Sequence, residues 1–149
     1  MMRRPKRTTK QPKKINFNVD PHHFINRDLS WLQFNRRVLA EAEDARNPLL
    51  ERVRFLIIFS SNLDEFVMKR VGYLKHQLLS GYSHRSVDGL SPTEQLAAIR
   101  KHIHEDQATR YSIYQKIVTE LATQDIHILK YKELSAEDQA YCDEIFKKR

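Results

Sequence analysis

The segment Phe55–Phe66 (FLIIFSSNLDEF) constrains the fold of this chain more than any other. Its apolar run stops at a Ser-Ser-Asn triplet and resumes at once with two carboxylates, a break that a purely core-filling run would not need. Asn62 is a good N-cap, and Glu65 lies three residues later, where the partner of a capping box belongs. The sequence therefore predicts two helices that meet here, with Asp64 and Glu65 in the first turn of the second, where negative charge suits the helix dipole.

The composition is typical of a helix-rich protein with a single packed domain. Of the 149 residues, 40% are hydrophobic and 30% are charged, while only three Gly and five Pro are available for tight turns. The single Cys142 excludes an internal disulfide and a cysteine-based zinc site, and it indicates a reducing compartment. No apolar run approaches the ~20 residues that span a bilayer, and no signal-peptide core follows the N-terminus. These features predict a cytoplasmic protein.

The net charge of +7 is concentrated at the N-terminus. Met1–Lys14 carries seven basic side chains and no acidic ones, whereas the rest of the chain carries 19 of each sign. This segment is interpreted as a disordered, solubilising arm, or alternatively as an arm that attracts a polyanion by counterion release. Because it contains no aromatic residues to stack on bases, recognition of nucleic acid is not expected.

Hydrophobic periodicity predicts a series of helices and one short strand. Capping signals mark several of the helix starts, including the second capping box Ser91–Glu94 with Pro92 at the first helical position. The predicted helices span residues 26 or 28 to about 45, 48–60, 63–79, about 91–122, and from 135 onward, and the predicted strand spans 125–129.

These elements predict a mainly α fold. We expect an N-terminal antiparallel helical bundle with a long helix, followed by a truncated α/β segment, because a lone strand cannot satisfy its backbone hydrogen bonds. The predicted organisation is a basic arm and lead-in over residues 1–23, a helical domain over 24–124, and the start of a second domain over 125–149.

Few residues suggest catalysis. None of the seven histidines lies in a nucleophile motif or at a metal-binding spacing, and glycine loops that cradle phosphate are absent.

Asp64 and Glu65 could act as a general acid and base, or they could be ordinary helix-start charges. Two carboxylates at a helix start would repel phosphate, so a nucleotide there should present its base. Asn62 suits this role, since its Oδ1 can cap the helix while its Nδ2 donates to a purine ring nitrogen.

Trp31 and four arginines are expected to have ordinary structural roles. Trp31 has the spacing of a core residue rather than of an exposed stacking platform. Two basic pairs flank the first interhelix turn, and we expect them to be solvated or to form ion pairs with nearby acidic residues. The pairs are Arg36 with Arg37 and Arg52 with Arg54, and the acidic residues are Glu41, Glu43 and Glu51.

Three linked motifs carry a family resemblance. They are Asn26–Leu39 (NRDLSWLQFNRRVL), Asn47–Leu56 (NPLLERVRFL), and Ser60–Phe66 (SSNLDEF) followed by Lys69-Arg70-Val71. In this order and spacing, they resemble the opening of bacterial polyphosphate kinase. The resemblance is strong over Phe24–Leu79 and weaker through the long helix and Ile126–Ile145, which looks like the start of the family's head domain.

The resemblance implies an enzyme that reversibly transfers the terminal phosphate of ATP to polyphosphate through a phosphohistidine. It also implies that Asn62 contacts the adenine of ATP. The family's phosphorylated histidine and magnesium-linked arginines lie in C-terminal domains, so we expect no catalytic residue and no Mg ligand in this chain, and no activity of the fragment alone. The resemblance further implies a homo-oligomer that can associate with a membrane at full length. The alternative is a non-enzymatic helical module for polyanion binding or assembly.

Overall fold

The computed structural model describes residues 20–81 and 83–148, and this part of the chain is mainly helical, as predicted. The expected basic arm, Met1–Lys14, lies outside the described part. None of the described helices has the length and apolar content needed to cross a membrane. The elements are η1 (Pro21–His23), α1 (Arg27–Glu43), α2 (Leu49–Phe66), the π-helical turn η2 (Val67–Val71), α3 (Gly72–Leu79), α4 (Pro92–Ala122), η3 (Tyr131–Glu133) and α5 (Ala136–Lys147).

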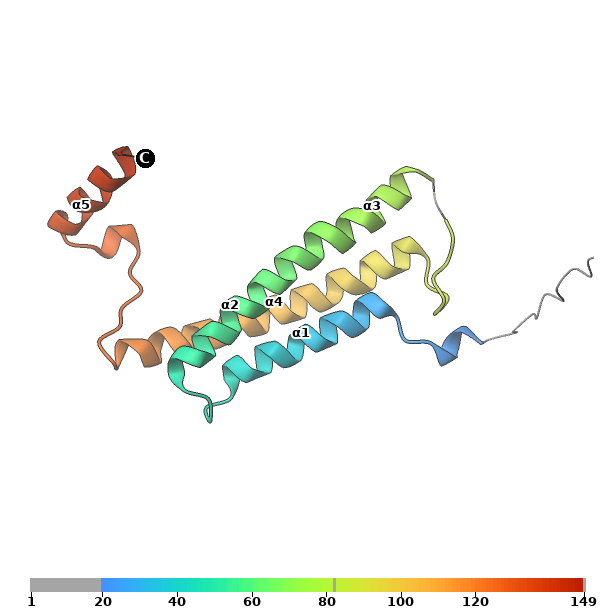
Figure 1. Cartoon of the computed structure of the whole chain (residues 1–149), viewed down its shortest axis with the longest axis horizontal. Helices are drawn as coiled ribbons and strands as arrows, with labels where there is room; N and C mark the ends of the chain where they lie inside the picture. The colour runs from blue at the N-terminus through green and yellow to red at the C-terminus, as the bar shows by residue number, and fades with distance from the viewer. Residues whose placement is uncertain (1–19, 82, 149) are drawn as a thin grey trace, which may run out of the picture.

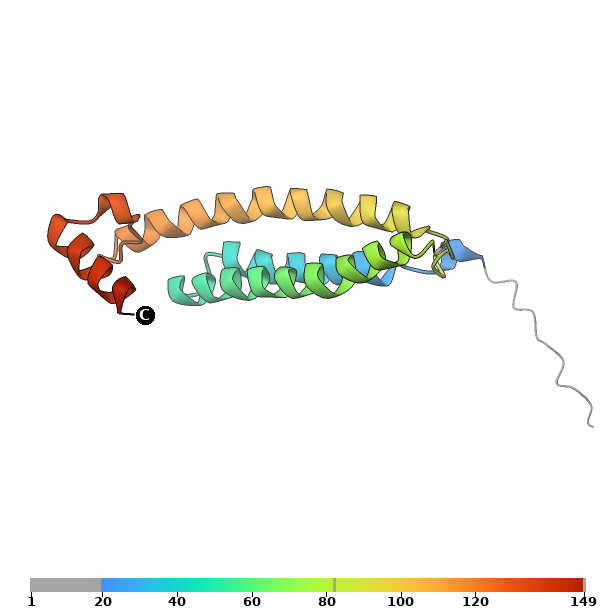
Figure 2. The same ribbon diagram turned by 90° about the horizontal axis from the view of Figure 1, so that it is seen from above.

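Three helical rods lie side by side and alternate in direction (Figures 1 and 2). The first rod is α1, and the second is α2, which continues through η2 into α3. After the 80–91 loop, α4 runs back along both. Helix α1 packs against α2 and α4, and the second rod also packs against α4. Helix α5 lies beyond the end of α4, and none of its residues is buried.

The core follows the helical stripes of the sequence. Leu32, Leu39 and Ala42 repeat at spacings of seven and three on α1, so they share one face. That face meets Phe59 from α2, which is fully buried, and matching residues from α4. The buried apolar set is Leu32, Leu39, Ala42, Leu56, Phe59, Leu63, Phe66, Leu74, Ile99, Ile113, Ile117 and Leu121.

The predicted helix break at Asn62 is wrong. Helix α2 passes through the Ser-Ser-Asn triplet without interruption, so Asn62 lies inside the helix and is not an N-cap. The Ser60 hydroxyl donates to the Leu56 carbonyl oxygen at 2.9 Å, which satisfies it within the helix. Since successive helical residues point about 100° apart, three polar residues in a row form no polar face. The irregularity comes later, at η2.

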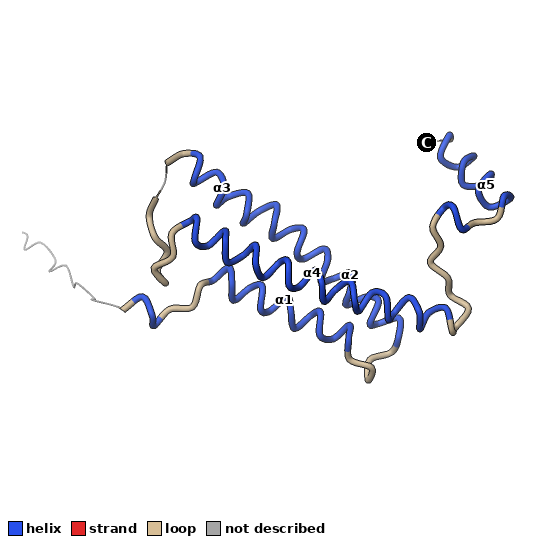
Figure 3. Tube along the Cα trace, turned by 180° about the vertical axis from the view of Figure 1, so that it is seen from behind, coloured by secondary structure: helices blue, strands red, loops and turns tan. Residues whose placement is uncertain are grey.

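The predicted strand at 125–129 is also wrong. The described residues contain no strand, and this stretch is neither helix nor strand (Figure 3). No partner strand adjoins it, and the Ile126 amide instead donates to the Leu121 carbonyl oxygen, 3.1 Å away, at the end of α4. The helix predicted from Ser135 is confirmed, because the Ser135 hydroxyl accepts from the Asp138 amide at the start of α5.

The capping box at the start of α4 is confirmed and yields a prediction. The Ser91 hydroxyl accepts from the Glu94 amide at 3.2 Å, and the Glu94 carboxylate accepts from the Ser91 amide at 2.7 Å. Replacing Ser91 with Ala should lower the free energy of unfolding by about 1 kcal/mol, because one amide of the first turn loses its acceptor. Urea unfolding would measure this, with Thr93→Ala in the same exposed turn as the control. Equal effects of the two substitutions would contradict a capping role.

Candidate functional site

A buried amide pair joins α1 to α2 at the position of Asn62. Asn35 is fully buried, and its Nδ2 donates to the Phe59 carbonyl oxygen at 3.1 Å. The Asn62 Nδ2 then donates to the Asn35 Oδ1 at 3.0 Å. Asn62 is partly buried, so its amide bridges the core and the surface.

The order of these bonds fixes how the Asn62 amide points. The Phe59 carbonyl can only accept, so Asn35 must turn its Nδ2 toward that oxygen and its Oδ1 toward Asn62. That oxygen needs a donor, which Asn62 supplies. The Asn62 Oδ1 and its second N–H have no partner among the described residues. Asn62 therefore offers one acceptor and one donor side by side.

This amide lines a surface groove of about 430 Å³ between the first rod and the second, here called the α1–α2 groove. Helix α1 contributes one wall, and α2 with η2 contributes the other. The lining residues are Arg27, Asp28, Trp31, Phe34, Asn62, Glu65, Phe66, Lys69 and Arg70.

Three aromatic rings shape the groove. Trp31 stacks on Phe66, with ring centroids 4.6 Å apart and ring planes only 8° from parallel. Trp31 is partly buried and packs against the core, as its spacing predicted, yet it also lines the groove. Phe34 is 47% exposed, and the Arg37 guanidinium lies 5.8 Å from its ring centre. A flat ligand could therefore lie against an aromatic wall while its edge meets Asn62.

The cations at the groove are largely neutralised within the chain. The buried Asp28 carboxylate accepts two hydrogen bonds from Arg70, at 2.9 and 3.0 Å. Lys69 pairs with Glu65 one helical turn earlier. With two carboxylates facing three cations, the groove has little net charge to attract a phosphate chain.

The acid–base interpretation of Asp64 and Glu65 finds no support in this geometry. The two carboxylates lie in the last turn of α2 rather than in the first turn of a helix, and Asp64 lines a different hollow between α2 and α4. A hydrogen bond from Lys69, together with its charge, lowers the pKa of Glu65 below its ordinary value. Glu65 is therefore ionised at neutral pH and cannot donate a proton there.

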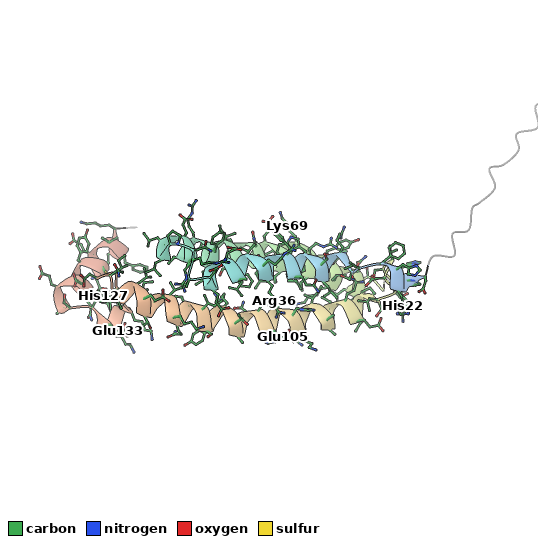
Figure 4. The ribbon with its side chains drawn as sticks, turned by 90° about the horizontal axis from the view of Figure 1, so that it is seen from below. His22, Arg36, Lys69, Glu105, His127 and Glu133 are labelled. Atoms are coloured by element: carbon green, nitrogen blue, oxygen red, sulfur yellow. The ribbon has the colours of Figure 1, made fainter. Side chains whose placement is uncertain are left out.

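The arginine pairs have more specific partners than the sequence indicated. Arg36 binds Asp106 and Glu105 on α4 rather than neighbours in sequence, and Figure 4 shows it facing Glu105. Arg52 is buried and donates to the Ala42 carbonyl and to Glu120. The expected pairing with Glu51 is formed by Arg54, at 3.1 Å.

Two site features were missed by the sequence interpretation. Asn35 lies three residues after Leu32 and four before Leu39, so it is a polar residue on a core stripe, a signal that was available. The Asp28–Arg70 pair spans 42 positions of sequence, and no local pattern could predict it. The described residues contain no group of three His, Cys, Asp or Glu side chains placed to hold a metal.

Comparison with known proteins gives the family. A family model described as the polyphosphate kinase N-terminal domain matches residues 24–129. A relative named polyphosphate kinase from an Exiguobacterium species is 48% identical over 126 residues, which are 84% of this chain and 18% of the relative. A second, from Thermosynechococcus vestitus, is 44% identical over 138 residues, which are 92% of this chain and 19% of the relative.

A third relative, named polyphosphate kinase 1, from Chlorobaculum tepidum, is 44% identical over 131 residues and is covered to 19% of its length. The chain thus spans less than a fifth of these relatives. The match covers both walls of the α1–α2 groove and all of α1 to α4. The chain belongs to the polyphosphate kinase family, in which it corresponds to the N-terminal domain.

Proposed function

We propose that this chain is the N-terminal part of an enzyme that reversibly transfers the terminal phosphate of ATP to polyphosphate, and that the α1–α2 groove binds the adenine. The observation that carries the proposal is the fixed orientation of the Asn62 amide on an aromatic groove. ATP and polyphosphate are the proposed substrates, the full-length enzyme is proposed to be a cytoplasmic homo-oligomer, and Mg²⁺ is proposed to be held by groups outside this chain.

The free groups of Asn62 are complementary to adenine. An adenine edge presents an exocyclic amine beside a ring nitrogen, which is a donor next to an acceptor, and Asn pairs with this arrangement through two hydrogen bonds. The Asn62 Oδ1 would accept from the amine and its second N–H would donate to the ring nitrogen. As a helix cap, Asn62 would have its Oδ1 occupied, whereas within α2 this oxygen is free in the described part of the chain, so the proposed contact with adenine has two hydrogen bonds.

The charges of the groove favour the base over the phosphates. Glu65 and Asp28 occupy the nearest cations, Lys69 and Arg70, and would repel a triphosphate placed between them. Phosphoryl transfer needs a positioned nucleophile and charge stabilisation, which we place in parts of the enzyme outside this chain. The isolated chain should therefore show no ATP-dependent synthesis of polyphosphate, and clear turnover by the purified chain would refute this division of labour.

Trp31, the only tryptophan, gives a direct readout of groove occupancy. Adenosine and ATP should quench its fluorescence saturably and with similar affinity, because the base makes the contacts. Guanosine presents the opposite donor and acceptor pattern and should bind at least about tenfold more weakly. Fluorescence titration of the 149-residue chain would measure all three.

Inorganic tripolyphosphate is the matched control for that titration. It carries the phosphate charges without a base, so it should leave Trp31 fluorescence unchanged at concentrations at which ATP saturates. If tripolyphosphate quenched as strongly as ATP, the groove would be a phosphate site and the adenine assignment would fail.

The basic N-terminal segment favours a second candidate function. All of the net charge of +7 resides in Met1–Lys14, so this segment could bind polyphosphate by counterion release without any catalytic role for the chain. Deleting Met1–Lys14 should then abolish polyphosphate binding and its salt dependence while adenosine quenching persists. Retained polyphosphate binding would exclude the segment as the binding element.

A further inference from the structure

The packing of the three rods leaves one seam open. The second rod packs against α4 through both α2 and α3, yet two hollows of about 540 and 360 Å³ lie between them. We call this the α2–α4 seam, and it is separate from the α1–α2 groove. Its hollows follow α4 in order, beside residues 96–104 and then beside residues 110–121.

The larger hollow has an apolar floor and a cationic rim. Its apolar lining is Val67, Val71, Leu96, Ala97, Ile99 and Ile103. Lys75, Arg100 and His104 complete the lining, which contains no carboxylate. None of these three side chains has a hydrogen bond or ion pair within residues 20–81 and 83–148. Most other cations of the rods do pair, as Arg36, Arg52 and Arg70 do.

The smaller hollow supplies an independent observation. Arg110 lines it, and the Arg110 Nε is buried without any hydrogen-bond partner. A buried unpaired donor of this kind is costly, by about 1–3 kcal/mol, and is normally satisfied by a partner group. The rest of the lining is mostly apolar, and Asp64 is its one carboxylate. Among the described residues, the seam therefore carries cationic side chains without an ion pair beside both hollows, Lys75 and Arg100 at the first and Arg110 at the second.

We propose that the α2–α4 seam is a docking site for an acidic amphipathic helix. An apolar stripe on such a helix fills a groove between two helices, as in other helix-in-groove complexes, and completes a four-helix arrangement. Carboxylates on its flanks would pair with Lys75, Arg100 and the guanidinium of Arg110. A fully hydrated polyphosphate chain would leave the apolar floor uncovered, so the floor and the rim together favour a peptide partner.

A reversal of charge preference tests this proposal. The probe is a synthetic helix of leucine stripes flanked by glutamates, with a lysine-flanked helix of the same pattern as its counterpart, measured by fluorescence anisotropy against the full 149-residue chain. The chain should bind the acidic helix roughly tenfold more tightly than the basic one, and the double variant Lys75→Glu/Arg100→Glu should reverse that preference.

The control is Lys132→Glu/Lys147→Glu, which changes the net charge equally at exposed lysines away from the seam and should preserve the wild-type preference. The basic segment Met1–Lys14 is the same in every variant, so it cannot produce a reversal. Failure of the acidic helix to bind would overturn the proposal, as would an equal loss in the control. Displacement of the bound helix by tripolyphosphate would indicate a polyanion site instead. A dimer of the free chain that Lys75→Glu/Arg100→Glu dissociates would show that a second copy fills the seam.

Discussion

Replacing Phe59 with Ala should lower the free energy of unfolding by about 3–5 kcal/mol, a large share of the 5–15 kcal/mol typical of a domain. Phe59 is fully buried at the centre of α2, where it faces the apolar stripes of α1 and α4. Truncation removes buried apolar surface and leaves a cavity that three rigid helices cannot close. Urea unfolding followed by far-UV circular dichroism would measure the loss.

Ile57→Ala is the matched control for that experiment. Ile57 lies two residues earlier on the same helix and is 59% exposed, so its truncation removes little buried surface. It should change stability by only a few tenths of a kcal/mol, about 0.5 at most. A comparable effect of the two substitutions would mean that α2 is not packed as described.

Replacing Asn62 with Ala should weaken adenosine and ATP binding roughly tenfold or more, since two hydrogen bonds of about 1 kcal/mol each are removed. Tripolyphosphate binding should not change, because the amide does not contact phosphate. The substitution also removes the bond to Asn35, so the free energy of unfolding should fall by about 1 kcal/mol. Trp31 fluorescence titration measures the first effect and urea unfolding the last.

Ser61→Ala serves as the neighbouring control. Ser61 is exposed and lines the α2–α4 seam rather than the α1–α2 groove, so ligand affinity should be unchanged. Asn62→Asp should be at least as damaging as Asn62→Ala, because a carboxylate would meet the Asn35 Oδ1 without a proton to donate. Full affinity in both Asn62 variants would remove Asn62 from the site.

The sequence predicted those elements whose signals are local. Hydrophobic spacing placed α1, α4 and α5 to within a few residues, and the Ser91 and Ser135 caps form at the predicted helix starts. The helix break predicted at the Ser-Ser-Asn triplet before Leu63 does not form, because tertiary contacts override the local capping preference of Asn62. Asn35 on another helix satisfies Asn62, and that partner makes a continuous α2 favourable.

Asn62 belongs to the candidate site for a different physical reason from the predicted one. Asn62 does line a groove, but as a mid-helix residue whose amide is oriented by Asn35 rather than as a helix cap. The expectation that Asp64 and Glu65 repel phosphate from a helix start fails, since there is no helix start. Charge compensation between Asp28 and Arg70, which are distant in sequence, now supports the same preference for a base.

The π-helical turn Val67–Val71 changes the direction in which the side chains after it point, relative to those before it on the second rod. The buried Leu74 lies eight positions after the buried Phe66, and eight steps of regular α-helix would rotate its side chain about 80° past the core-facing direction. The wider turn absorbs this excess, so both side chains reach one core although their spacing does not suit a single α-helix. A chain one residue shorter in this turn could run as regular helix with Leu74 still inward. The π-helical turn therefore accommodates one residue more than a regular α-helix with the same inward-facing positions would contain. It directly precedes Gly72, where α3 begins.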